Sequence, residues 1–173
     1  FDDNIELVNK SKGRFQPGFR LAPEGFLQYE GPFILAIGNN KVRSQLANEL
    51  QVHYATAIHT NAIIDGGISI GLGSVVFAGA IIQPDSQLGE HVIINTSASV
   101  DHDCQIDDFA HVSPGATLCG NVVVEQGAHV GAGATIIQGV KIGRWSTVGA
   151  GAVVIRDVPD FATVVGCPAK QVT

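Results

Sequence analysis

The sequence predicts a mainly β protein, a parallel β-helix of hexapeptide repeats preceded by a partial Rossmann-like α/β unit. Two observations predict the β-helix. Every position reached by stepping six residues at a time from Ile58 to Val154 is Ile, Leu or Val. A mostly small residue, such as Ala98 or Ala116, follows each of them four residues later. A helical repeat is excluded, because a period of six matches neither 3.5 nor 3.6 residues per turn.

The repeat also predicts how the coils are built. One hexad makes a short strand and a bend, three hexads close a coil of about 18 residues, and each coil buries its aliphatic side chains by stacking on the next. Gly, Asn or Asp often comes directly after the aliphatic residue, so we expect the corners there. We place the β-helix at residues 52–159 and a capping segment at residues 160–173, since a solenoid needs its open edge covered.

The α/β unit is expected at residues 1–51. Its clearest part is an apolar run at residues 33–37, followed by Gly38-Asn39-Asn40 and then by apolar residues at helical spacing. This order predicts a strand, a turn and a helix. Such a turn can present backbone N–H groups to a phosphate, although an ordinary βα turn is the commoner meaning of so short a motif.

Composition and charge argue against several functions. A formal charge of -6 and a pI near 5.4 disfavour nucleic-acid binding, which needs a basic patch. No apolar run approaches the roughly 18 residues that span a bilayer, so no membrane insertion is expected. The three cysteines lack CxxC spacing and fit reduced thiols in the cytoplasm. Phe1 begins the chain without an apolar targeting segment, and we expect further residues before it.

His102 is the candidate catalytic residue that the repeat places best. It follows the inward-facing Val100 by two residues, so we expect it to point outward from a flat face. Gly120 lies one coil further on and would leave a gap beside the imidazole for a slender ligand. Asp101 and Asp103 could orient the ring and stabilise its charged form. The alternative is a solvated surface histidine with no role in catalysis.

His111 is the second candidate, nine residues after His102. Because this is half of a coil, the two imidazoles should lie on different faces and cannot easily meet within one chain. If both line one site, that site lies between subunits. His129 stacks one coil above His111, and the alternative for this pair is an exposed polar ladder.

The repeats, the α/β unit before them and Gly166-Cys167-Pro168-Ala169-Lys170 after them resemble the left-handed β-helix acetyltransferases. The chain is most similar to the nucleotide-sugar 4-amino N-acetyltransferases and their sialic-acid O-acetyltransferase relatives. The resemblance covers nearly the whole chain. It implies a left-handed coil, acetyl-CoA as co-substrate, no metal, and a homotrimer with active sites between subunits.

The resemblance also implies roles for single residues. His102 would be the general base that takes a proton from the acceptor, worth roughly 10² to 10⁴ in rate, and Asp103 would orient it where the family usually has Glu. Asp2 and Asp3 look like the acidic pair that holds the nucleotide base. The sugar nucleotide would also contact Gly38, Asn39, Asn40 and Arg43, the last as a phosphate partner. Acetyl-CoA would contact Asn95, His111, Gly120, Gly131 and Lys170.

A covalent acetyl-cysteine route is less attractive than direct transfer. Cys104 takes an inward position, where burial disfavours ionisation of the thiol. Cys119 and Cys167 have no neighbouring histidine in the sequence. We therefore expect direct transfer from acetyl-CoA.

Three functions remain open on these grounds. Transfer to the 4-amino group of a UDP-linked sugar is favoured, because an α/β unit precedes the coils. O-acetylation of sialic acid or a related sugar is the second. The third is a metal-dependent enzyme like the γ-type carbonic anhydrases, or a purely structural β-helix. The anhydrase pattern resembles two histidines five residues apart, and none of the six histidines has that spacing.

Overall fold

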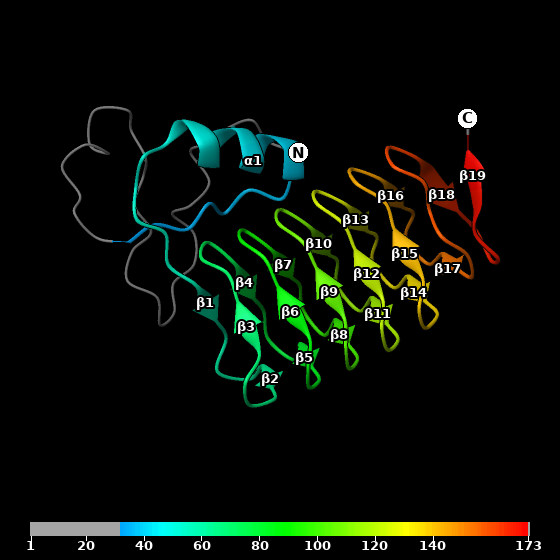
Figure 1. Ribbon diagram of the computed structural model, residues 1–173, viewed down its shortest axis with the longest axis horizontal. Coiled ribbons are helices and arrows are strands. Elements are labelled where there is room, and N and C mark those ends of the chain that lie inside the picture. The colour runs from blue at the N-terminus through cyan, green and yellow to red at the C-terminus, as the bar shows by residue number, and fades with distance from the viewer. Residues whose placement is uncertain (1–31, 173) are drawn as a thin grey trace. The chain divides into compact units, whose positions relative to one another are not determined.

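The computed structural model describes residues 32–172, which form a parallel β-helix with one helix before it (Figure 1). The chain divides into two compact units, Phe1–Gly31 and Pro32–Thr173, and all described residues belong to the second. Asp2 and Asp3 therefore lie outside the described residues. No helix within residues 32–172 is long and apolar enough to cross a membrane.

The strands of the β-helix are two residues long, and two three-residue strands follow them. They are β1 (Ala57–Ile58), β2 (Ile63–Ile64), β3 (Ser69–Ile70), β4 (Val75–Val76), β5 (Ile81–Ile82), β6 (Gln87–Leu88), β7 (Ile93–Ile94), β8 (Ser99–Val100), β9 (Gln105–Ile106), β10 (His111–Val112), β11 (Thr117–Leu118), β12 (Val123–Val124), β13 (His129–Val130), β14 (Thr135–Ile136), β15 (Lys141–Ile142), β16 (Thr147–Val148), β17 (Val153–Val154), β18 (Thr163–Val165) and β19 (Lys170–Val172).

Every third strand pairs in parallel with the equivalent strand of the next coil, which produces three sheets (Figure 1). The eight-stranded sheet has the order β1-β4-β7-β10-β13-β16-β18-β19, the six-stranded sheet β17-β14-β11-β8-β5-β2, and the five-stranded sheet β15-β12-β9-β6-β3. Register is strict, so that His111 pairs with Ile93 on one side and His129 on the other. From β1 to β17 one coil therefore separates residues that differ by 18 in sequence, as the hexad period predicts, whereas the last coil pairs Thr147 with Thr163.

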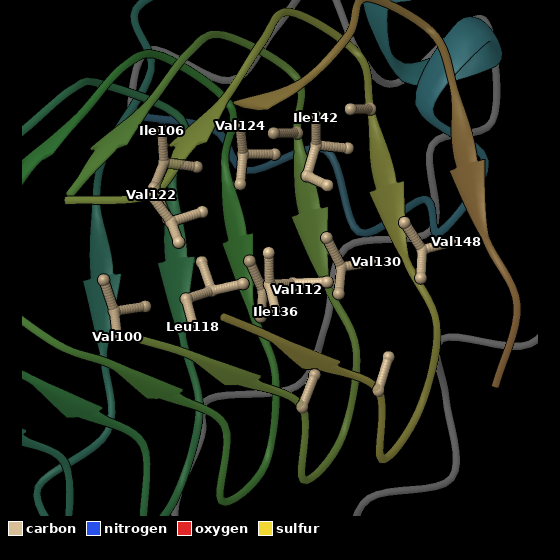
Figure 2. Close-up of a cluster of buried hydrophobic side chains, with 14 of the residues drawn as sticks. Val100, Ile106, Val112, Leu118, Val122, Val124, Val130, Ile136, Ile142 and Val148 are labelled. Carbon is tan, nitrogen blue, oxygen red and sulfur yellow. The ribbon is translucent and has the colours of Figure 1, made fainter. Parts of the chain in front are cut away.

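The aliphatic residue of each hexad points into the space between the sheets (Figure 2). Val100, Ile106, Val112, Leu118, Val124, Val130, Ile136 and Ile142 are each 0 or 1 % exposed. The small residues four positions later fill the remaining gaps, with Ala98, Ala110, Ala116, Ala128 and Ala134 at 0 %. Because each coil alone leaves this apolar surface open, stacking supplies the burial that stabilises the fold.

Ile136→Ala tests how much the core depends on single side chains. Ile136 is fully buried, so the substitution leaves a cavity and is expected to reduce the free energy of unfolding by about 2–5 kcal/mol. The matched control is Ile155→Ala, since Ile155 is 42 % exposed and its loss should change stability by less than about 1 kcal/mol. Denaturant titration of both variants measures the effect. Equal midpoints for the two would contradict this description of the core.

The corners differ from the prediction by two positions. Backbone φ is positive three residues after the aliphatic residue, for example at Asp103 (57°) and Gly115 (64°), and not directly after it. Glycine directly after the aliphatic residue has another cause, which is close stacking of coils. A Cβ on Gly71 would lie 2.5 Å from the carbonyl carbon of Gly89, a distance that no side chain tolerates.

Helix α1 (Asn40–Glu49) confirms the helix predicted after the Gly38 turn. Asn39 caps it, because its Oδ1 accepts hydrogen bonds from the backbone N–H groups of Lys41 and Val42 at 3.0 and 3.2 Å. The strand predicted at residues 33–37 does not form as such: Phe33 makes an isolated parallel bridge with Tyr54, and residues 34–37 belong to no strand.

The chain after β17 closes one edge of the stack. β18 extends the eight-stranded sheet in parallel to β16, and β19 pairs antiparallel to β18 with Val165 opposite Lys170. The last strand thus covers hydrogen-bonding groups at the sheet's end, which a solenoid otherwise leaves open. Lys170 is exposed on this strand.

Candidate functional site

His102 lies on the turn between β8 and β9, at the corner where the six-stranded sheet meets the five-stranded sheet. The expected flat-face position is wrong for a simple reason. The strands contain only two residues, so a residue two positions after the inward Val100 is already in the turn. The His102 side chain is 59 % exposed, which places its imidazole where a ligand can reach it.

Three contacts orient His102 and its turn. Its Nδ1 lies 2.7 Å from Oδ2 of Asp103, and its backbone N–H donates to Oδ1 of Asp101 at 2.8 Å. The backbone N–H of Asp103 donates to the carbonyl of Pro84 in the preceding coil at 3.1 Å. A carboxylate can only accept, so Nδ1 carries the proton and Nε2 of the neutral ring keeps its lone pair. Nε2 is therefore the basic atom of the site.

Carboxylates raise the pKa of His102 above its ordinary value. The main cause is the hydrogen bond to Asp103, followed by the charge of Asp101, with smaller contributions from the charges of Asp103 and Asp85. Each favours the imidazolium form. The ring is thus a stronger base than a free histidine but is neutral over a narrower range of pH.

An open groove of about 560 Å³ begins at the His102 ring. Its lining residues are Asp101, His102, Cys119, Gly120, Asn121, Gln138 and Gly139. The His102 ring lies directly against Gly120, because a Cβ on Gly120 would lie 2.7 Å from both Cε1 and Nε2 of His102. The ring itself takes up the space that a side chain at position 120 would need, and the groove opens beside it along Cys119, Asn121 and Gln138.

The sequence interpretation missed four members of this groove, which are Cys119, Asn121, Gln138 and Gly139. Cys119 lies in the groove with His102 although no histidine neighbours it in sequence, and Gln138 lies two coils above His102. One step of 18 residues from Asp101 leads to Cys119, and two steps from His102 lead to Gln138, so the coil length could have found both. The pKa of Cys104, by contrast, is raised to about 11, chiefly by burial, which confirms it as a weakly acidic thiol of the core.

His111 lies on β10 in the eight-stranded sheet, away from the His102 corner, as the nine-residue spacing predicts. Its Nε2 is 3.1 Å from Nδ2 of Asn95, and its ring centroid is 4.8 Å from that of His129. His129 Nε2 in turn lies 3.0 Å from Oγ of Ser113. The alternative of an exposed ladder does not hold for His111, which is 8 % exposed.

Burial keeps His111 neutral. Its pKa is lowered to about 4, first by desolvation and then by the charges of His129 and Arg43. The Asn95 amide therefore donates to Nε2, which leaves the proton on Nδ1. That Nδ1 is shielded from solvent, and the interaction of His111 with the backbone of Gly38 opposes part of the fall in pKa.

A second groove, of about 240 Å³, separates residues 34–38 from the eight-stranded sheet. Its lining is mostly apolar and consists of Ile34, Leu35, Ala36, Ile37, Gly38, Ala57, Val75, Phe77, Ile93, Asn95 and His111. Three residues predicted for different ligands, Gly38, Asn95 and His111, are thus brought together here. We call this space the loop groove.

The other residues predicted to bind substrate or coenzyme take structural positions. Asn39 is occupied as the helix cap. Arg43 is 1 % exposed, and its guanidinium donates hydrogen bonds to protein oxygens. The expected contact with a phosphate is therefore not available to it. Gly131 allows close stacking, since a Cβ there would lie 2.6 Å from the backbone nitrogen of Ala150. Lys170 and Gly131 line neither groove.

No metal centre is visible in the part of the chain that the structure describes. Within residues 32–172, no group of three or more His, Cys, Asp or Glu side chains is placed to hold a metal ion. The two grooves contain histidines singly and in different places, so neither offers the several converging ligands that a protein zinc site requires.

Comparison with known proteins identifies relatives of one kind. Residues 121–156 match the family described as bacterial transferase hexapeptide (six repeats), and residues 60–84 match the hexapeptide repeat of succinyl-transferase. No curated protein sequence matches the chain.

Three solved structures are similar over most of their length. The acetyltransferase domain of PglB from Neisseria gonorrhoeae FA1090, also solved with acetyl coenzyme A, is 42 % identical over 82 % of this chain and 70 % of that chain, with a TM-score of 0.80. PerB from Caulobacter crescentus, solved with CoA and GDP-perosamine, is 39 % identical over 87 % and 74 %, with a TM-score of 0.84. WeeI from Acinetobacter baumannii AYE is 30 % identical over 95 % and 82 %, with a TM-score of 0.84.

Proposed function

The chain belongs to the left-handed β-helix family of hexapeptide-repeat sugar N-acetyltransferases, and we propose that it acetylates the amino group of a nucleotide-linked amino sugar with His102 as general base. It is an acetyl-CoA-dependent acyltransferase. The observation that carries the proposed mechanism is the His102–Asp103 pair, with Nδ1 and Oδ2 2.7 Å apart, at the groove that His102 and Gly120 line. We further propose the 4-amino group and a UDP carrier, although PerB was solved with a GDP-linked sugar.

The chemistry requires one base and two aligned substrates. Nε2 of His102 accepts a proton as the amine nitrogen attacks the thioester carbon and the new C–N bond forms. The C–S bond then breaks, and the imidazolium returns the proton to the departing thiolate. The products are the N-acetylated sugar and free coenzyme A. Holding both substrates in the groove supplies much of the remaining rate.

We propose that the complete site lies between subunits of a homotrimer. His102 and His111 lie on different sides of one β-helix, so a site that uses both needs His111 of the partner subunit. Sedimentation of the active protein tests this, and an active monomer would refute it. The three free cysteines support a cytoplasmic location, where thiols stay reduced.

The test of the activity is an acceptor panel. The protein is incubated with acetyl-CoA and UDP-linked 4-amino sugars, GDP-perosamine, the corresponding 4-hydroxy sugars or sialic acid, and released thiol is followed. We expect release with amino sugars only, with the product heavier by one acetyl group. Transfer to sialic acid alone, or to no amine in the panel, would refute the proposal.

Asp103→Asn tests the pH dependence of the base. Only neutral His102 accepts a proton, so kcat/KM rises as pH increases through its pKa. Asp103 raises that pKa; its removal therefore moves the rising limb to lower pH. The limiting rate at high pH should fall as well, because the neutral amide makes a weaker bond to Nδ1–H than the carboxylate does and leaves the ring less basic. Rate profiles between pH 5 and 9 measure both effects.

The matched control is Asp108→Asn on a different corner. Oδ1 of Asp108 accepts from the backbone N–H of Glu90 at 2.7 Å, a bond that an amide oxygen can retain, and Asp108 does not contribute to the pKa shift of His102. Its profile should coincide with that of the wild type. A rising limb that stays in place in Asp103→Asn would show that another group is the base.

A further inference from the structure

We infer that Arg43 is a positioning residue for the acceptor sugar, because its buried guanidinium joins the two walls of the loop groove and sets their spacing. The inference rests on the proposed function and adds that part of the sugar nucleotide occupies the loop groove, which Gly38 lines. It assigns Arg43 a role different from the phosphate contact that the sequence suggested.

The guanidinium of Arg43 makes four hydrogen bonds to acceptors from three parts of the chain. Nη1 donates to the carbonyl of Ile37 at 2.8 Å. Nε donates to the carbonyl of His91 at 3.0 Å, and Nη2 to that of Phe109 at 2.8 Å. Nη2 also donates to Oδ1 of Asn40 at 2.9 Å. One planar group thus ties the segment before α1 to two successive coils.

These acceptors stand next to the groove lining on both sides. Ile37 itself belongs to the outer wall. On the inner wall, His91 is two residues before Ile93 on β7, and Phe109 is two residues before His111 on β10. Movement of the guanidinium would therefore change the distance between Ile37 and the strands that carry Ile93 and His111.

A second tether acts beside the first. Nδ2 of Asn40 donates to the carbonyls of Gly127 and Ala128, at 3.1 and 3.2 Å. Asn40 is 7 % exposed, so the Asn40 and Arg43 side chains, which both hold the start of α1, are buried. Together they fix the helix start on the coils that carry His91, Phe109 and Gly127.

An arginine at position 43 is better suited to holding the groove walls in place than to filling space in the core. No carboxylate pairs with Arg43 within residues 32–172, and burial lowers its pKa to about 10, so it remains charged at neutral pH. A buried charge is costly, whereas an apolar residue would pack there at no such cost. What arginine adds is a rigid fork with five donors in fixed directions.

The same charge affects the inner wall. Arg43 is one of the causes, after desolvation and His129, that lower the pKa of His111. It therefore helps to keep a neutral imidazole in the groove, whose Nε2 accepts a hydrogen bond from Asn95. The loop groove thus combines a mostly apolar lining with an uncharged imidazole.

The kinetic test compares Arg43→Met, Arg43→Lys and the control Arg144→Met, an exposed arginine on the turn between β15 and β16. With GDP-perosamine and a UDP-linked 4-amino sugar as acceptor probes, Arg43→Met should raise the acceptor KM by about 10-fold or more, as expected for loss of net binding near 1.4 kcal/mol. The KM for acetyl-CoA should change less than about 2-fold. Arg43→Lys, which keeps charge but has fewer directed donors, should be intermediate.

A purely stabilising role predicts a different pattern. Loss of folded protein would lower apparent kcat and leave both KM values unchanged. Equal changes in the two KM values, or none, would overturn the inference. If Arg43→Met does not fold, Asn40→Ala removes one acceptor of Arg43 and the second tether but keeps the three carbonyl bonds. It should raise the acceptor KM in the same direction by a smaller factor.

Amide hydrogen exchange separates this inference from the proposed function. In the wild type the N–H of Ile37 donates to the carbonyl of Leu35 at 2.9 Å. Arg43→Met should speed exchange across residues 34–38 by about 10-fold and leave β11 and β14 unchanged. If no amino sugar is acetylated, the proposed function fails, but hydrogen exchange still tests whether Arg43 holds residues 34–38 in place. Unchanged exchange at residues 34–38 would overturn the inference.

Discussion

Replacing His102 with alanine is expected to lower kcat by about 10²- to 10⁴-fold, the usual contribution of a general base. The substrates would still bind, because the groove is also formed by Cys119, Gly120 and Gln138. KM for acetyl-CoA should therefore change little. The exposed position of the ring means that folding should not suffer, and thermal unfolding of the variant should match the wild type.

Two controls make the His102→Ala result specific. His53→Ala removes an imidazole that is exposed and lines neither groove, and should leave kcat unchanged. Added imidazole should restore part of the activity of His102→Ala, since the truncated site is open to solvent. Unchanged turnover in His102→Ala would favour a β-helix without this chemistry.

The fold could be predicted from the sequence because one packing rule repeats along the chain. Each hexad places one aliphatic residue inward, and three hexads return to the same sheet, so position in the sequence converts directly into position in space. That conversion places Gly120 beside His102 and keeps His111 away from both. It fails at the turn itself, because strands of two residues put His102 on a corner and not on a face.

The loop groove could not be predicted, because it depends on contacts between helix α1 and the coils of the β-helix. Arg43 reaches His91 and Phe109 across 48 and 66 residues, and no repeat relates helix α1 to those coils. Sequence motif alone therefore suggested a surface phosphate contact. Burial of the guanidinium among carbonyl groups could be seen only once the helix was placed against the coils.

The two grooves divide the proposed reaction between different sides of the β-helix. The His102 groove carries the proposed base, whereas the loop groove carries a mostly apolar wall and the neutral His111. Neither holds the residues of the other. A reaction that needs both therefore favours an assembly in which the corner of one subunit approaches the eight-stranded sheet of its neighbour.

Gly120→Ala is expected to lower kcat by about 10²-fold with little change in stability. The new methyl group would lie 2.7 Å from Nε2 and Cε1 of His102, so the ring must move to relieve the overlap. Displacement of a reacting group by about 1 Å can cost this much in rate. The backbone of Gly120 does not need positive φ, and the exposed ring can rotate away, so the fold should tolerate alanine.

Gly66→Ala is the matched control at the equivalent corner position, three coils before Gly120 in sequence. A Cβ there meets nothing within 4 Å, and the backbone N–H that donates to Oδ1 of Asp65 is kept by alanine. Activity should equal the wild type. In a double-mutant cycle, Gly120→Ala should have no further effect once His102 is alanine, because it acts through the ring. A separate, additive loss would show instead that the methyl group blocks the groove itself.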